Sequence, residues 1–277
     1  MRPFAHLSIG VVLALLAPAI SRSAELSQAD RARLLAAYPG VLERIDGNDL
    51  VWRDGTRMPL DDGKGDKPFE EWFDKPDVAD MFAIPYPVGA EAKPPAKDID
   101  PGRARTSAFF DKVYGDCRNG AVEKNLMTVE WLPTKAKQKL PFNKMNGAAA
   151  ALAEASRELD ALAPSFDVFL TPSAGTYNCR VIAGTNRVSA HGHAIAIDIA
   201  LKRSNYWRND KPGKDGALPY KNEIPMEIVR IFEKHGFIWG GRWYHYDTMH
   251  FEYRPELIGV KGDAGPATKA PQPSSAR

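Results

Sequence analysis

The sequence predicts an α+β fold in which a mostly antiparallel sheet is flanked by helices. Segments in which apolar and polar residues alternate, as they do in strands, are interspersed with segments of helical period. The links between neighbouring strands are short and contain Gly, which is typical of hairpins. The 277 residues are enough for one sizeable domain with extensions, or for two small ones.

Residues 1–24 have the pattern of a secretory signal peptide. Arg2 precedes an apolar stretch, Leu7–Ile20, which is too short to span a bilayer and is followed by small residues. An uncleaved anchor is the alternative, but the proline in this stretch and the small residues after it favour cleavage near Ser23 or Ala24. No cysteine directly follows the stretch, so nothing suggests a lipid anchor, and no later segment is apolar enough to span. We therefore expect a secreted, periplasmic protein without a membrane anchor after cleavage.

Residues 25–105 predict a small helix and hairpin extension followed by a linker. Residues 26–38 form a short amphipathic helix with Leu34, Leu35 and Tyr38 on one side. Residues 41–60 alternate around two Gly-containing turns, which indicates a hairpin or meander. Residues 62–104 are rich in Lys, Asp, Pro and Gly with a few aromatic residues, and we expect a long, partly packed connection around Ile84 to Pro101.

A denser domain is expected over residues 106–258, followed by a disordered tail at 259–277. Asn146 is the candidate cap of a helix that ends before Pro164, and another helix is expected from Ile224 to Gly236, where glycine ends it. The expected strands are residues 125–132, 167–171, 194–200, 237–241 and 249–255.

The charge balance gives no case for a nucleic-acid partner. Without Arg2 and Arg22, both in the signal segment, the chain has 35 Lys and Arg residues against 35 Asp and Glu residues. A net charge of zero provides no electrostatic attraction for a phosphate backbone, and the sequence contains no basic cluster or stacking motif.

The chain has two cysteines, Cys117 and Cys179. Because an exported protein is in an oxidising compartment, we favour a disulfide between them, with two buried free thiols as the alternative.

Asp198 is the most informative polar residue in the second half of the chain. It lies in the alternating stretch AIAIDIA, on the face formed by Ala196 and Ala200, opposite the isoleucines. A buried carboxylate there must be paired, hydrogen-bonded or metal-bound, and the small alanines leave room over that face. The alternative to a metal is a hydrogen bond to backbone amides or a pair with an arginine.

Histidines surround this stretch in sequence and offer further metal ligands. His191 and His193 are two residues apart, so both can face the same way in an extended chain. Asp247 precedes His250 by three residues, and the two reach one site only if the chain turns between them. A catalytic zinc uses three His, Asp or Glu ligands with a fourth position open for water, and a nearby carboxylate takes the proton from that water.

Two motifs together resemble the zinc D-alanyl-D-alanine peptidases. Ser-x-His-x-x-Ala-x-Ala-x-Asp at residues 189–198 is similar to the first motif of this family, and Asp-x-x-His-Phe at residues 247–251 is similar to the second. The run FIWGGRWYHYDTMHFE also resembles the lead-in to the last ligand. The family includes the vancomycin-resistance carboxypeptidases and the L-alanoyl-D-glutamate endopeptidases. It implies the hedgehog/DD-peptidase fold.

Carried over position by position, the resemblance implies a Zn²⁺ ion held by His191, Asp198 and His250. Asp247 falls at the catalytic carboxylate, and Arg180 is our best match to the arginine that stabilises the oxyanion or binds the substrate carboxylate, with Arg187 as the alternative. We expect Ser189 and His245 to contact substrate, with packing the alternative for His245. His193 becomes a neighbour of the ligands rather than a ligand, and His235 receives no catalytic role.

One departure from the family pattern is Ala194, which stands where the family has glycine. If that position requires positive φ, alanine there costs about 1 kcal/mol.

The expected function is hydrolysis of peptidoglycan stem peptides by a monomeric zinc metallopeptidase. We favour a D-alanyl-D-alanine carboxypeptidase, and an endopeptidase of the same family is the closest alternative. A zinc-stabilised wall-binding module without hydrolysis is a third reading, although Asp247 beside the metal argues against it. A structural protein without a metal would require the two-part motif to be a coincidence.

Overall fold

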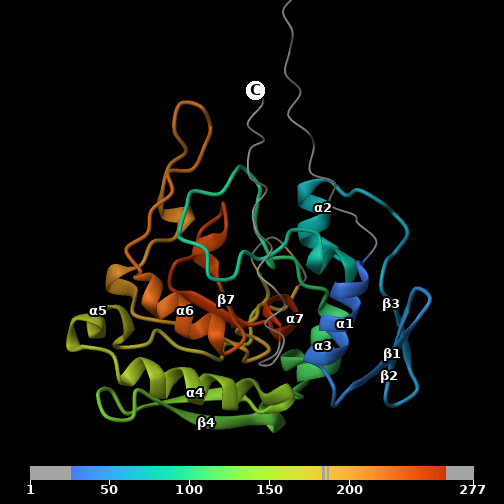
Figure 1. Cartoon of the computed structure of the whole chain (residues 1–277), viewed down its shortest axis with the longest axis horizontal. Helices are drawn as coiled ribbons and strands as arrows, with labels where there is room; N and C mark the ends of the chain where they lie inside the picture. The colour runs from blue at the N-terminus through green and yellow to red at the C-terminus, as the bar shows by residue number, and fades with distance from the viewer. Residues whose placement is uncertain (1–25, 183–184, 186, 260–277) are drawn as a thin grey trace, which may run out of the picture.

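The computed structural model describes residues 26–182, 185 and 187–259 (Figure 1). The predicted signal peptide and all but the first residue of the predicted tail lie outside the described residues. Among the described residues, no helix is both long and apolar enough to cross a membrane.

The architecture is α+β, as predicted, but the strands form three small antiparallel sheets instead of one. In order within each sheet, the strands are β1 (Leu42–Asp46), β2 (Asp49–Trp52) and β3 (Arg57–Pro59); β4 (Leu126–Trp131) and β5 (Gln138–Asn143); and β6 (Ala196–Asp198), β8 (His250–Tyr253) and β7 (Phe237–Trp239). β6 and β7 have only three residues each.

Seven α-helices surround these sheets. They are α1 (Gln28–Ala37), α2 (Phe69–Asp74), α3 (Ser107–Tyr114), α4 (Ala148–Asp160), α5 (Asp167–Leu170), α6 (Met226–Lys234) and α7 (Pro255–Ile258) among the described residues. Short 3-10 turns lie at Ala79–Phe82, Cys117–Asn119, Glu123–Asn125, Met145–Gly147, Pro164–Phe166, Leu201–Arg203, Trp207–Asn209 and Gly240–Arg242.

The N-terminal hairpin packs on the same hydrophobic core as the rest of the chain. Tyr38, at the end of α1, meets Phe109 of α3 edge to face with 5.0 Å between ring centroids, and Trp52 of β2 lies 5.5 Å from the same ring. All three side chains are buried. Figure 1 shows this hairpin at one end of the molecule, beside α1 and α3. The extension is therefore fixed to α3 and the shared core by apolar burial.

Two expectations for individual elements are wrong. Residues 167–170 form α5 rather than a strand, because Pro164 starts a helical turn with the φ that a helix requires, and a short apolar run does not distinguish helix from strand. Asn146 does not cap α4: its φ is +50°, Gly147 is the residue before the helix, and the Asn146 side chain donates to the carbonyl of Ala37 at 3.0 Å. An asparagine tolerates this left-handed backbone.

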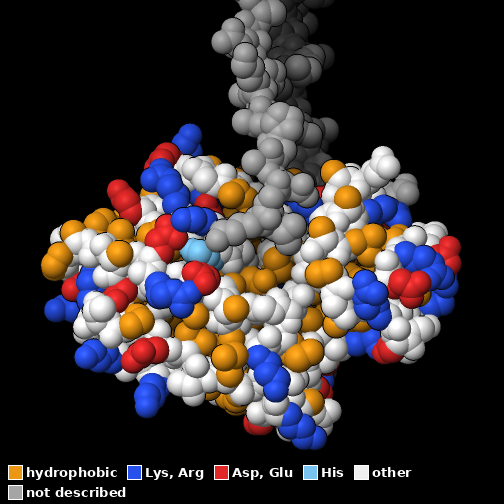
Figure 2. Space-filling view, turned by 60° about the horizontal axis from the view of Figure 1, so that its bottom comes forward, with side chains coloured by type: hydrophobic (Ala, Val, Ile, Leu, Met, Phe, Trp, Pro, Cys, Tyr) orange, Lys and Arg blue, Asp and Glu red, His pale blue; other side chains and the backbone are white. Residues whose placement is uncertain are grey.

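The stretch around Asp198 is buried on both sides. Ile195, Ile197 and Ile199 are fully buried, and Ala196 and Ala200 are buried as well. β6 pairs with β8 on one edge, and the backbone of Asp198 also bonds with Gly175 on the other. The outer surface is different: Figure 2 shows positive and negative side chains interspersed over one face of the molecule.

Candidate active site

Three predicted ligands converge where β6 and β8 pair. Asp198 lies directly opposite His250 in the ladder, and the turn before β6 brings His191 to the same place. His191 Nε2 lies 3.2 Å from Asp198 Oδ1 and 3.2 Å from His250 Nδ1, and the latter two atoms are 3.0 Å apart. Atoms that share one tetrahedral zinc at about 2.0–2.1 Å lie about 3.3 Å from one another. The three side chains therefore fit a zinc ion.

Each histidine is oriented by its second ring nitrogen. His191 Nδ1 donates to the backbone carbonyl of Thr176 at 2.6 Å, and His250 Nε2 lies 3.1 Å from a carboxylate oxygen of Glu252. A carbonyl oxygen can only accept, so His191 presents Nε2 with its lone pair free. Such outer partners set the tautomer and the ring orientation of metal-binding histidines. Glu252 plays this part for His250.

Glu252 is fully buried between two arginines. Arg105 Nη1 lies 2.9 Å from one oxygen and Arg254 Nη1 lies 2.9 Å from the other. Burial alone would raise the pKa of this carboxyl, but the charge of Arg105, together with His250 and Arg254, holds the pKa well below its usual range. The only sequence signal for this role is the spacing of Glu252 two residues after His250, which places both side chains on one face of β8.

The buried charges continue away from the metal ligands. Arg254 also bonds Glu256, and the hydroxyl of Tyr38 donates to Glu256 at 2.8 Å. A chain of alternating charges thus connects α1 with His250, through side chains that are all fully buried or nearly so. Sequence reasoning missed it because Tyr38 and Glu256 are 218 residues apart.

Asp247 lies in the same cavity as the three ligands. The chain turns as the motif requires, since the His250 N–H donates to the Asp247 carbonyl at 3.2 Å. The close approach needs Gly240, where a Cβ would lie 2.5 Å from the Asp247 carbonyl oxygen. Asp247 Oδ1 is buried without a hydrogen-bond partner among the described residues. Burial raises the pKa of Asp247 to about 6, against the charge of His250. The carboxylate is therefore available to accept a proton.

The two candidate arginines occupy different environments. Arg180 is exposed and lines the cavity that contains the three ligands. Arg187 is buried and does not line it; its guanidinium lies over the ring of Phe73 at 4.3 Å, and its Nε lies 4.0 Å from Asp74 Oδ1. Burial, with the charge of Arg105, lowers the pKa of Arg187 to about 9. Of the two, Arg180 has the position that the predicted role needs.

The remaining predicted residues lie around this centre. Ser189 lines the cavity, and its Oγ accepts the N–H of Gly192 at 3.1 Å, which shapes the turn before β6. His193 Nε2 lies 2.8 Å from Asp111, and His235 Nε2 lies 2.9 Å from Glu158, so neither faces the ligands. His245 lines the cavity and bonds Asp100.

Ala194 has the positive φ that its place in the motif suggested. Its φ is +54°, and the side chain is fully buried beside Val122 and Val188. A glycine would adopt this backbone without strain, which explains the family pattern.

Cys117 and Cys179 form a disulfide, with 5.7 Å between their Cα atoms. It ties the turn that follows α3 to the segment that carries Thr176 and Arg180. This segment has little regular structure of its own, so the covalent link helps to hold it against the site.

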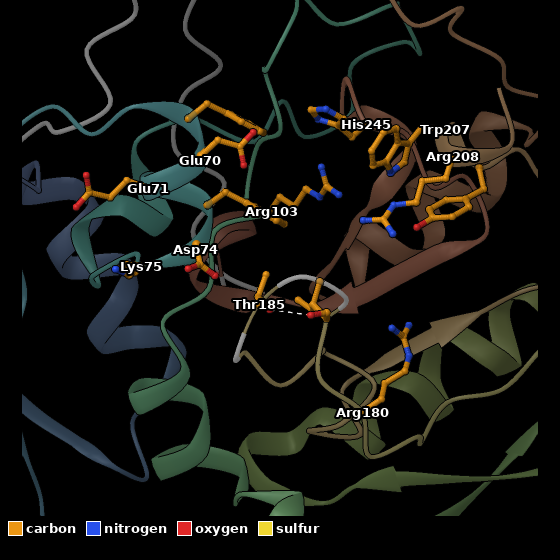
Figure 3. Close-up of a pocket in the computed structure, with 14 residues that line it drawn as sticks. Glu70, Glu71, Asp74, Lys75, Arg103, Arg180, Thr185, Trp207, Arg208 and His245 are labelled. Carbon is orange, nitrogen blue, oxygen red and sulfur yellow. Dashed lines mark hydrogen bonds between the residues drawn. The ribbon is translucent and has the colours of Figure 1, made fainter. Parts of the chain in front are cut away.

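A larger cavity of about 740 Å³ adjoins the cavity at the ligands, and the two share Arg103, Arg180 and His245 (Figure 3). One wall of it is α2, which contributes Phe69, Phe73 and Asp74, among others. The opposite side contains Tyr206 to Arg208. The N-terminal region of residues 25–105 therefore forms part of the cleft, which the sequence did not indicate.

A His–Asp–His cluster beside a free carboxylate defines the site of a zinc metallopeptidase. Residues 183–253 match a family model described as D-alanyl-D-alanine carboxypeptidase. The match contains all three ligands and Asp247, but not the N-terminal region that forms α2. Searches of curated proteins and of solved structures found no match.

Proposed function

We propose that this protein is an exported zinc peptidase that removes the terminal D-alanine from peptidoglycan stem peptides. The observation that carries the proposal is the triangle of His191, Asp198 and His250 with the unpartnered Oδ1 of Asp247 in the same cavity. The matched family and the sequence of residues 1–24 support the substrate and the compartment.

When bound, zinc supplies Lewis acidity and lowers the pKa of a bound water to about 7. Asp247 accepts the proton of the attacking water at Oδ1 and returns it to the leaving amine. Arg180 binds the negative charge of the substrate, either at the oxyanion or at its terminal carboxylate. Glu252 and the Thr176 carbonyl keep the two histidines in place during the reaction.

The larger cavity favours an endopeptidase as the second candidate. Its volume of about 740 Å³ is in the range that encloses a ligand of several residues, and it extends from the metal site toward α2. A carboxypeptidase needs little space beyond the released residue, whereas an endopeptidase must hold peptide on both sides of the cleaved bond.

Digestion of purified muropeptides by the wild type and by Asp247→Asn tests the proposal. We expect the wild type to release free D-alanine and the variant to be at least about 100-fold slower, because general base catalysis contributes about that much or more. Mass spectrometry of the products separates D-alanine from larger fragments, which would establish the endopeptidase instead. Equal rates for both proteins, or no product from the wild type, would contradict the proposal.

A further inference from the structure

A buried carboxylate outside the matched segment holds His245. Asp100 is fully buried, and its two oxygens bond the backbone N–H of His245 at 3.0 Å and the ring Nδ1 at 2.8 Å. Arg103 Nη1 also lies 2.7 Å from Oδ2 of Asp100. Asp100 belongs to the segment predicted as a linker, yet most of its hydrogen-bonding capacity is directed at a residue that lines the cleft.

The backbone around Asp100 is fixed to the loop that carries His245. The N–H of Tyr244 donates to the carbonyl of Ile99 at 2.9 Å, and the indole Nε1 of Trp243 donates to the carbonyl of Pro101 at 2.8 Å. Contacts on both sides of Asp100 thus set its position independently of the His245 ring. The carboxylate is in place before any ligand binds.

This arrangement determines which nitrogen of His245 faces the cleft. A deprotonated carboxylate can only accept, so Nδ1 carries the proton and Nε2 is left for a ligand. Both cavities are lined by His245, whose ring stacks on Phe69 of α2 at 5.3 Å and meets the edge of Trp207 at 4.7 Å. Figure 3 shows His245 beside Trp207 at the edge of the larger cavity. The ring is therefore held on three sides, by Asp100 and the two aromatic residues.

We infer that Asp100 is a positioning residue for the proposed reaction, acting through His245. It holds the ring proton on Nδ1 and keeps Nε2 directed at the bound peptide, so that the ring is oriented to form a hydrogen bond with the substrate through Nε2. The inference rests on the proposed function. It also extends the active site beyond the matched segment, to a residue of the N-terminal half.

A double-mutant cycle tests the inference with muropeptide hydrolysis as the readout. Asp100→Asn places an amide against Nδ1 and removes the negative charge, so we expect kcat to fall about 100-fold with little change in KM. In the His245→Gln background the same substitution should change kcat less than twofold. An equal loss in both backgrounds would show a merely structural role and overturn the inference. Zinc content and Tm of each variant establish that the folded, loaded proteins are being compared.

Nitrogen NMR of the histidine rings in the wild type needs no Asp100 variant and no activity. His245, assigned with His245→Gln, should show a protonated Nδ1, and a neutral ring protonated only at Nε2 would overturn the inference. If the wild type does not hydrolyse muropeptides, the proposed function fails while this measurement still decides the geometry. If it does hydrolyse them but Asp100→Asn is unchanged, only the inference fails.

Discussion

The two walls of the cleft differ in how their buried polar groups are satisfied. On the wall formed by β6 and β8, both histidine ligands and Glu252 have partners for their buried polar atoms, and only single atoms of Asp247, Arg105 and Arg254 have none among the described residues. On the wall around α2, Asp74 Oδ1 and all three guanidinium nitrogens of Arg187 have no hydrogen-bond partner among the described residues. A satisfied buried network is rigid, whereas unpaired buried groups cost stability. The wall formed by β6 and β8, which we call the metal wall, is therefore rigid before a ligand binds. The wall around α2, which we call the α2 wall, loses stability because its buried polar groups lack hydrogen bonds.

The largest expected effect comes from removing the metal or a ligand. Asp198→Asn weakens one corner of the triangle, so kcat for muropeptides should fall at least about a thousandfold, as expected when several kcal/mol of charge stabilisation is lost. A chelator should inactivate the wild type to a similar extent. Added zinc should restore the wild type but not the variant, and a chelator-resistant wild type would contradict the account.

Glu252→Gln should destabilise the metal wall because it removes a buried negative charge. The change leaves Arg105 and Arg254 with less compensation in a fully buried place, so we expect a loss of about 3–5 kcal/mol in the free energy of unfolding. Zinc affinity should fall about 10–100-fold because His250 loses its outer partner.

Urea unfolding and zinc titration measure the two effects. Glu158→Gln is the matched control: this half-exposed carboxylate pairs with Lys234 and His235 at the surface, and its loss should cost less than about 1 kcal/mol. Equal effects of the two substitutions would show that the buried network contributes no more to the free energy of unfolding than the Glu158 ion pairs do.

Substitutions of the two arginines sharpen the comparison between the walls. Arg187→Met removes a buried guanidinium that has no hydrogen-bond partner among the described residues and only a long, 4.0 Å ion pair with Asp74. The free energy of unfolding should stay unchanged or rise by about 1–2 kcal/mol, with activity retained. Arg180→Met changes an exposed side chain in the cavity, so stability should stay the same while kcat/KM falls about 100-fold. The opposite pattern of activity would make Arg187 the functional arginine.

The smallest expected effect is at Ala194. Ala194→Gly removes the backbone strain of the positive φ, which stabilises the fold by about 1 kcal/mol. It also removes a buried methyl group, which costs about 0.8 kcal/mol of stability. We expect the free energy of unfolding to change by less than about 0.5 kcal/mol. Ala194→Val adds bulk at the same φ and should cost at least about 1–2 kcal/mol. Thermal unfolding of both variants would measure this, and a large loss with glycine would show that the methyl packing dominates.

The same comparison shows what could be predicted from the sequence. The ligands of the metal wall lie in two short motifs, so the family resemblance was enough to imply His191, Asp198 and His250, and the spacing of Asp247 and His250 required a turn between them. Glu252 and Asp100 were missed because their partners, Arg105 and His245, are about 145 residues away in the chain. Residues 167–170 were assigned to a strand because four apolar-rich residues fit either period.

The α2 wall could not be foreseen for a related reason. The spacing of Phe69, Phe73 and Asp74 matches no functional motif. Their place in the cleft depends on how the N-terminal half packs on the core. Contacts between segments that are distant in the chain depend on the whole fold, so local sequence patterns do not predict them.

Metal analysis of the purified protein tests the central claim most directly. After dialysis against metal-free buffer, the wild type should retain one zinc ion per chain, and Asp198→Asn should retain much less under the same conditions. A wild type without stoichiometric zinc, or a variant that keeps as much as the wild type, would contradict the assignment of His191, Asp198 and His250 as a zinc site.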